Sequence, residues 1–212
     1  SSTKLALSSH ACDMNTSYFF FSSFFMTSIL FSPLVFATDE VFGKTLGIVG
    51  YGSIGKAVEK AAKGLGMKVL VYTRTPKHNG ETEFVTFEEL LNRSDVLTLH
   101  CPLNEQSANL MNKETFAKMK DGAFFVNTAR GGVVVEKDLL EALESGKLSG
   151  AAVDVLTKEP MSEDCVLQDA PNIIITPHTA WAPLTTRKRL VDLVANNLRA
   201  FLNGEEVNNL AK

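Results

Sequence analysis

Four polar side chains in the second half of the sequence have the types that hydride transfer to a carbonyl needs from a protein. His178 suits proton donation near neutral pH, and a carboxylate such as Glu159 would favour its imidazolium form and fix its orientation. The rigid fork of Arg130 can hold a carboxylate in two bonds while it polarises an adjacent carbonyl. Asp154 can accept a hydrogen bond from a carboxamide such as that of nicotinamide. With a nicotinamide as hydride source, this set would supply the proton and stabilise charge on oxygen.

A glycine-rich turn earlier in the chain predicts where such a cofactor would bind. The apolar run at residues 45–49 leads into Gly50, Gly52 and Gly55, and residues 53–65 read as a helix. In this G-x-G-x-x-G spacing the first glycine allows a tight turn, the second lets backbone approach a pyrophosphate, and the third lets the helix pack closely. The anion would then bind N–H groups at the positive end of the helix dipole.

Short apolar segments alternate with helical patterns from Lys44 onward. Further strands are expected at 68–72, 95–99, 123–127, 150–155 and 173–176. Further helices are expected at 87–93 behind a capping box from Thr86 to Glu89, at 113–119, at 136–145 before Gly146, and at 185–203 before Gly204. This alternation predicts an α/β fold, a doubly wound parallel sheet of the Rossmann type.

That fold would gather the polar residues at one edge of the sheet, because ligands bind beyond the carboxyl ends of parallel strands. Arg130, Asp154, Glu159 and His178 follow the fourth, fifth and sixth expected strands. Each also has an ordinary interpretation, as a surface ion pair, a turn cap, an exposed loop acid or a turn histidine. His10, His78 and His100 lack comparable context, and Trp181 is expected to pack locally.

Composition narrows the class of protein. The 212 residues carry a formal net charge of −3, which gives no electrostatic case for binding nucleic acid or an anionic membrane surface. Cys12, Cys101 and Cys165 are widely spaced and form no C-x-x-C pair, so neither a disulfide framework nor a metal site is expected. A reducing, cytoplasmic location is the expectation.

Residues 1–40 differ from the rest of the chain. The stretch 18–37 holds seven of the fourteen phenylalanines and is long enough to span a bilayer. Five Ser or Thr residues, Pro33 and the lack of a flanking Lys/Arg cluster argue against a span, and a secretory signal fits less well. Three interpretations stay open: a segment foreign to the fold, a buried apolar segment, and a true membrane tether.

Several motifs, in order, resemble the D-isomer-specific 2-hydroxyacid dehydrogenase family. They are KTLGIVGYGSIG, LHCPLNEQSANLMN, KMKDGAFFVNTARGG, GAAVDVLTKEP and NIIITPHTAW, within a resemblance that runs from about Gly43 to Leu210. The PHTAW motif and the ending FLNGEEVNN are most similar to the glycerate dehydrogenase (hydroxypyruvate reductase) branch. The resemblance implies reduction of a small 2-oxo acid, of the hydroxypyruvate or glyoxylate type, by NAD(P)H.

The resemblance also implies roles for individual residues. An Arg–Glu–His catalytic set falls on Arg130, Glu159 and His178. Together with the glycine turn and the residues after the second strand, the expected cofactor contacts are Gly50, Gly52, Ser53, Ile54, Gly55, Thr73, Arg74, Thr75, Cys101, Pro102, Ser107, Thr128, Ala129, Arg130 and Asp154.

Two departures from the family pattern affect the predicted function. NAD-using members often carry an acid after the second strand, whereas this chain has Thr73, Arg74 and Thr75; NAD is the family default, but the arginine suggests NADP. Residues 1–40 also stand where a substrate-binding segment and a dimer-forming helix are expected. The domains are therefore expected at 1–40 (unassigned), 41–182 (NAD(P)-binding) and 183–212 (C-terminal helix and tail). A family homodimer is in question, and a dinucleotide-binding fragment or NAD-sensing interaction protein is the alternative function.

Overall fold

The computed structural model describes residues 40–76, 80–205 and 207–208. The expectations for the Phe/Ser-rich segment, His10, Cys12 and His78 lie outside these residues. One compact unit ends at Ala182, and a second includes the chain from Pro183 onward. Each is described by itself.

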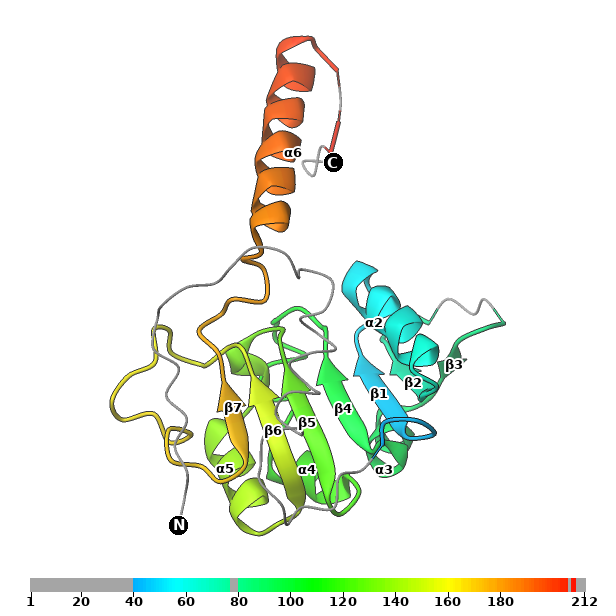
Figure 1. The fold of residues 1–212 in the computed structure, drawn as a ribbon, viewed down its shortest axis with the longest axis vertical. Coiled ribbons are helices and arrows are strands. Elements are labelled where there is room, and N and C mark those ends of the chain that lie inside the picture. Colours follow the sequence, from blue (N-terminus) through cyan, green and yellow to red (C-terminus); the bar gives the residue numbers. More distant parts are fainter. Residues whose placement is uncertain (1–39, 77–79, 206, 209–212) are drawn as a thin grey trace. The chain divides into compact units, whose positions relative to one another are not determined.

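Seven parallel strands of the described residues form a single sheet in the order β3-β2-β1-β4-β5-β6-β7 (Figure 1). They are β1 (Thr45–Val49), β2 (Lys68–Tyr72), β3 (Glu83–Phe84), β4 (Val96–Leu99), β5 (Ala123–Asn127), β6 (Leu148–Val153) and β7 (Ile173–Ile175). The chain builds outward from β1 in one direction and then from β4 in the other. The predicted doubly wound α/β class is confirmed, and the point between β1 and β4 is where such folds bind ligands.

Helices cover both faces of this sheet. They are α2 (Ser53–Gly64), α3 (Phe87–Arg93), α4 (Lys113–Lys118) and α5 (Glu136–Glu144). Helix α2 joins β1 to β2, whereas α3, α4 and α5 precede steps in the opposite direction. Right-handed crossovers therefore place α2 on one face of the sheet and α3, α4 and α5 on the other (Figure 1). Strand β4 is buried along its whole length, and Phe116 of α4 packs edge-to-face on Phe125 of β5 with ring centroids 5.3 Å apart.

Most element boundaries agree with the sequence predictions. β2 and β5 begin and end where expected, and α3 begins at the predicted capping box, in which Thr86 Oγ1 accepts from Glu89 N while Glu89 accepts from Thr86 N. The six-strand expectation was incomplete, because the two-residue strand β3 is too short to leave a period-2 pattern. The 3₁₀ turn η1 (Gly131–Val133) was also not predicted.

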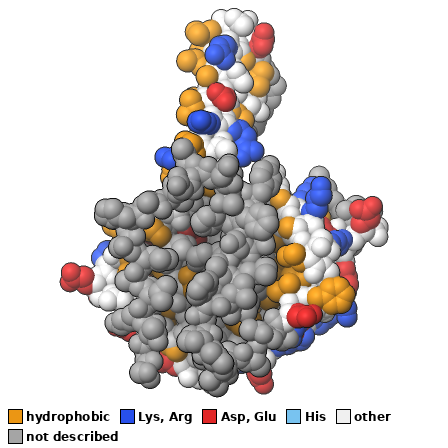
Figure 2. Space-filling model, viewed as in Figure 1, with side chains coloured by type: hydrophobic (Ala, Val, Ile, Leu, Met, Phe, Trp, Pro, Cys, Tyr) orange, Lys and Arg blue, Asp and Glu red, His pale blue; other side chains and the backbone are white. Residues whose placement is uncertain are grey.

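Helix α6 (Leu184–Leu202) belongs to the second unit. Figure 2 shows hydrophobic side chains along this helix together with Lys and Arg. The exposed hydrophobic residues are Leu184, Leu190, Val191, Leu193, Val194, Leu198, Phe201 and Leu202. Among the helices of the described residues, none is long and apolar enough to cross a bilayer.

Candidate dinucleotide and catalytic site

The glycine turn after β1 is required partly by the protein's own packing. Gly50 has φ +94°, and a Cβ there would lie 2.7 Å from the backbone of His100. A Cβ on Gly55 would lie 2.4 Å from the carbonyl oxygen of Gly50. Both positions therefore bring backbone segments closer than any side chain allows.

Packing inside the protein does not require a glycine at position 52. Gly52 is the N-cap of α2 with φ −83° and ψ −162°, and a Cβ there would meet nothing within 4 Å. Within the described residues no side chain caps α2; its first turn contains no acidic residue, and Ser53 and Ile54 are exposed. The first N–H groups of α2 thus stand at the positive end of the helix dipole without a capping side chain among the described residues, which is the arrangement that binds a phosphate or pyrophosphate.

The residues that follow β2 lie beside this turn. Thr73 is half-buried, whereas Arg74 and Thr75 are exposed. Arg74 Nη1 donates a hydrogen bond to Gln106 Oε1, in the loop that follows β4. No acidic side chain of the described residues forms an ion pair with Arg74, so its charge is available to a ligand.

The loop after β4 is held together by a buried hydroxyl. Ser107 Oγ donates to the carbonyl of Pro102 at 2.6 Å and accepts from Asn104 N at 2.9 Å. Burial raises the pKa of the Cys101 thiol, while the nearby charge of Arg74 acts in the opposite direction. Burial lowers the pKa of His100 to about 4, so this histidine is neutral at physiological pH.

Arg130 is carried by a turn that the side chain of Asn127 fixes. Asn127 is 1% exposed; its Oδ1 accepts from Ala129 N and its Nδ2 donates to Arg130 O, each at 3.0 Å. The Arg130 side chain is exposed and donates to Ala129 O at 2.6 Å. Gly131 lets this turn approach the next loop, since a Cβ there would lie 2.0 Å from the carbonyl carbon of Leu156.

Glu159 and His178 form a hydrogen-bonded pair. His178 Nδ1 lies 2.6 Å from Glu159 Oε2, and Glu159 Oε1 accepts from Leu156 N at 2.9 Å. The hydrogen bond from His178 is the main cause that holds the pKa of Glu159 below its usual value, and the Leu156 N–H and the charges of His178 and Arg130 act in the same direction. The carboxylate therefore stays ionised, and Nε2 is the ring nitrogen of His178 that a substrate could reach.

Asp154 fixes the loop that carries His178. Its buried carboxylate, 5% exposed, accepts from Thr176 Oγ1 at 2.5 Å and from Thr179 N and Ala180 N at 2.9 Å. Its carbonyl oxygen accepts from His178 N at 2.8 Å, and its own N–H donates to Asn127 O at 2.9 Å. Asp154 thereby joins the loops bearing Arg130 and His178 through two backbone hydrogen bonds.

The structure places the predicted site residues along the carboxyl edge of the sheet in the first unit. It brings Arg130, Glu159 and His178 together, and Arg74 close to Cys101. Asn127 and Gln106 were not singled out from the sequence. A polar residue at the buried end of a strand was a signal for Asn127, whereas nothing local indicated Gln106.

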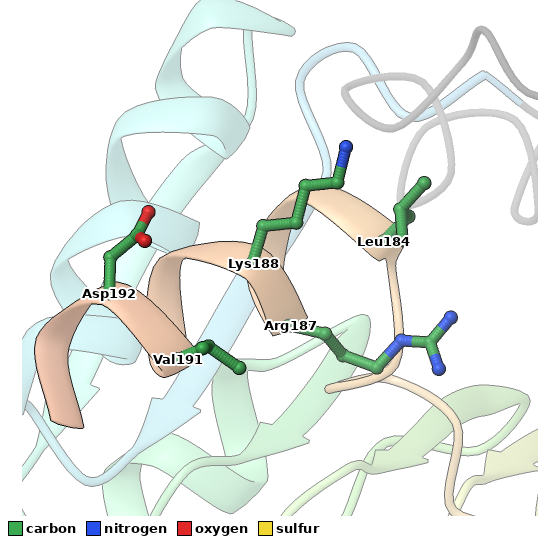
Figure 3. Close-up of a pocket in the computed structure, with 5 residues that line it drawn as sticks. All are labelled: Leu184, Arg187, Lys188, Val191 and Asp192. Carbon is green, nitrogen blue, oxygen red and sulfur yellow. The ribbon is translucent and has the colours of Figure 1, made fainter. Parts of the chain in front are cut away.

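A pocket lies along α6, in the second unit. Its described lining is Leu184, Arg187, Lys188, Val191 and Asp192, all on that helix (Figure 3). None of the predicted catalytic or cofactor residues belongs to it. The candidate site therefore rests on the sheet edge, not on this pocket.

Comparison with known proteins agrees with the fold and the motifs. The family model for the D-isomer specific 2-hydroxyacid dehydrogenase NAD binding domain matches residues 25–180. A hydroxypyruvate reductase from Blautia hydrogenotrophica is 49% identical over 172 residues, and a glycerate dehydrogenase from Methylorubrum extorquens is 43% identical over 171 residues. Each match covers 80% of this chain and 53% of the relative, so the chain spans about half the length of these curated relatives.

A solved structure gives the same result in three dimensions. The crystal structure of a glyoxylate reductase from Paecilomyes thermophila matches with a TM-score of 0.77 at 35% identity. The match covers 88% of this chain and 58% of that one.

Proposed function

This chain belongs to the D-isomer specific 2-hydroxyacid dehydrogenase family, and from that premise we propose that it reduces a small 2-oxo acid to the corresponding 2-hydroxy acid with NAD(P)H. The observation that carries the proposal is the pair of His178 and Glu159, in which Nδ1 lies 2.6 Å from Oε2. The charge of Arg130 helps to lower the pKa of Glu159. These three side chains stand at the same sheet edge as an open dinucleotide turn.

The residues present fit a dinucleotide cofactor. Gly52 leaves space that a Cβ would fill, and the uncapped first turn of α2 offers N–H groups to a pyrophosphate. Ser53, Ile54 and Gly55 would contribute to this cradle. The further predicted contacts lie after β2, β4, β5 and β6: Thr73, Arg74, Thr75, Cys101, Pro102, Ser107, Thr128, Ala129 and Asp154. When bound, the nicotinamide supplies the hydride.

His178 would act as the proton donor. With Nδ1–H donated to Glu159, the second proton of the imidazolium stands on Nε2 and can pass to the carbonyl oxygen of the substrate. The ionised Glu159 is hydrogen-bonded to Nδ1 and keeps the ring oriented. Asp154 keeps the supporting loop in place, because its carboxylate holds Thr179 N and Ala180 N.

Arg130 would bind the acid group of the substrate. Its guanidinium is exposed, and its one described hydrogen bond, to Ala129 O, leaves donors for a carboxylate. A bidentate contact would orient the 2-oxo acid and polarise its carbonyl. The names of the similar proteins favour hydroxypyruvate or glyoxylate as substrates.

The residue Arg74 suggests NADP as the cofactor. Arg74 follows β2 at the position where NAD-specific sites place an acid, and no described carboxylate neutralises it. A 2′-phosphate would find a positive charge there. Equal or tighter binding of NADH, unchanged in Arg74→Ala, would argue for NAD instead.

One experiment tests the proposed activity. Absorbance of NADH and NADPH is followed with hydroxypyruvate, beside a titration of dinucleotide binding. We expect turnover in the parent chain, and in His178→Ala loss of turnover with binding retained. Binding without turnover in the parent chain would support the second candidate, a dinucleotide-binding protein without reductase activity, which the half-length match to the curated relatives makes worth testing. Neither binding nor turnover would contradict both.

A further inference from the structure

We infer that Gln106 is a second specificity-determining residue of the dinucleotide site, acting with Arg74 on the 2′ substituent of the adenosine ribose; the inference rests on the proposed function. Arg74 Nη1 donates to Gln106 Oε1, and both side chains are exposed. The bond joins the loop after β2 to the loop after β4. Because β2 and β4 are the two neighbours of β1, the two side chains meet across the end of the strand that enters the glycine turn.

Both side chains keep hydrogen-bond donors for a ligand. A guanidinium has five N–H groups, and within the described chain Arg74 uses one of them. The two N–H groups of the Gln106 amide have no partner among the described residues. The pair therefore offers a positive charge and several donors, and its one acceptor atom, the amide oxygen of Gln106, already accepts a hydrogen bond from Arg74.

Gln106 sits on the more firmly held of the two loops. Its backbone N–H donates to Asn104 Oδ1 at 3.0 Å, and the neighbouring Ser107 hydroxyl closes the same turn onto Pro102 O at 2.6 Å. Arg74 is instead carried by the exposed segment that leaves β2. Gln106 thus positions the guanidinium, rather than the reverse.

This donor-rich pair distinguishes the two cofactors. A 2′-phosphate accepts hydrogen bonds and brings negative charge, so it can bind both the guanidinium and the amide. A ribose 2′-hydroxyl is best bound by a carboxylate acceptor, which the pair lacks. Gln106→Glu changes one group at nearly constant shape: the new carboxylate would neutralise Arg74 and offer that acceptor.

The test compares binding of NADP⁺ and NAD⁺ to the full chain by calorimetry. A buried hydrogen bond to a charged group corresponds to roughly a 10- to 100-fold change in affinity, and an exposed one to less. Because Arg74 and Gln106 are exposed, we expect Gln106→Glu to weaken NADP⁺ binding about tenfold, at the lower end of that range. NAD⁺ binding should be unchanged or tighter. The matched control is Gln168→Glu, the same change at an exposed glutamine elsewhere in the unit, which should leave the NADP⁺/NAD⁺ ratio unaltered.

Each outcome separates the inference from the proposed function. If the parent chain binds both dinucleotides and the ratio is the same in Gln106→Glu and Gln168→Glu, the role of Gln106 is wrong while the proposed function stands. Equal weakening of NAD⁺ and NADP⁺ in Gln106→Glu would likewise overturn it, since that result describes a general loss of the site. If the parent chain binds neither dinucleotide, the proposed function itself fails.

Discussion

Alanine substitutions at Gly52 and Gly55 should have opposite consequences, although the two glycines lie three residues apart on one turn. At Gly55 the new Cβ would lie 2.4 Å from Gly50 O, about 1 Å inside an ordinary C···O contact, and backbone must move to relieve it. Overpacking of this kind costs about 1–3 kcal/mol. For a unit of this size that lowers the melting temperature by roughly 3–10 °C.

Gly52→Ala should leave stability nearly unchanged. The new methyl group meets nothing within 4 Å, and φ −83° with ψ −162° is open to alanine. The poorer N-cap costs about 0.5–1 kcal/mol, and the reduced entropy of the unfolded chain offsets it by about 0.4–1 kcal/mol. Dinucleotide affinity should nevertheless fall at least about tenfold, because the methyl group stands where the pyrophosphate must approach the backbone.

The assay pairs thermal unfolding, followed by circular dichroism, with calorimetric titration of NADPH for both variants. The expected pattern is loss of stability in Gly55→Ala and loss of binding without loss of stability in Gly52→Ala. A Gly52→Ala protein that binds NADPH as tightly as the parent would refute the assignment of this turn as the pyrophosphate seat. Gly64→Ala is a suitable control, since its Cβ would also meet nothing within 4 Å and it lies at the opposite end of α2.

Two further predictions concern the catalytic loops. Asp154→Asn should lower the melting temperature by roughly 3–10 °C, because the amide has one acceptor oxygen in place of two. Either Thr179 N or Ala180 N then loses its acceptor, at a cost of about 1–3 kcal/mol, and an unchanged melting temperature would contradict this. The depressed pKa of Glu159 stabilises the fold above the ordinary carboxyl pKa of about 4.3, and this stabilisation is lost as pH falls through the lower native pKa. The parent should therefore melt above Glu159→Gln near neutral pH, with the gap closing on acidification; a gap independent of pH would refute the pairing.

The sequence predicted those elements whose structure depends on neighbouring residues in the chain. The strand Lys68–Tyr72 is buried at its three central residues, whereas Ala123–Asn127 has one buried face and carries the exposed Phe124 on the other. Their apolar composition alone identifies both as strands. The capping box at Thr86 works for the same reason, since its two hydrogen bonds join residues three apart. Order along the chain then predicted which side chains reach one edge of the sheet.

Hydrogen bonds between residues far apart in the chain could not be predicted from the sequence. Asp154 was singled out as a possible contact for the nicotinamide carboxamide, and the structure shows its carboxylate accepting from residues 22–26 positions later. Oδ2 has one described partner, Ala180 N, so the predicted cofactor contact stays a prediction. Gln106 illustrates the same limit: it lies 32 residues from Arg74, and only the sheet order brings them together.

The candidate site is best recognised by what the fold leaves unused. Gly50 and Gly55 are explained by contacts inside the protein, whereas Gly52 is not. Arg74 lacks a carboxylate partner among the described residues, and Nε2 of His178 lacks a described hydrogen bond while Nδ1 is held by Glu159. Folding alone gives no reason for an open glycine, an uncompensated guanidinium or an imidazole fixed from one side. Their placement along one edge of the sheet is accounted for if a dinucleotide and a 2-oxo acid supply the missing partners.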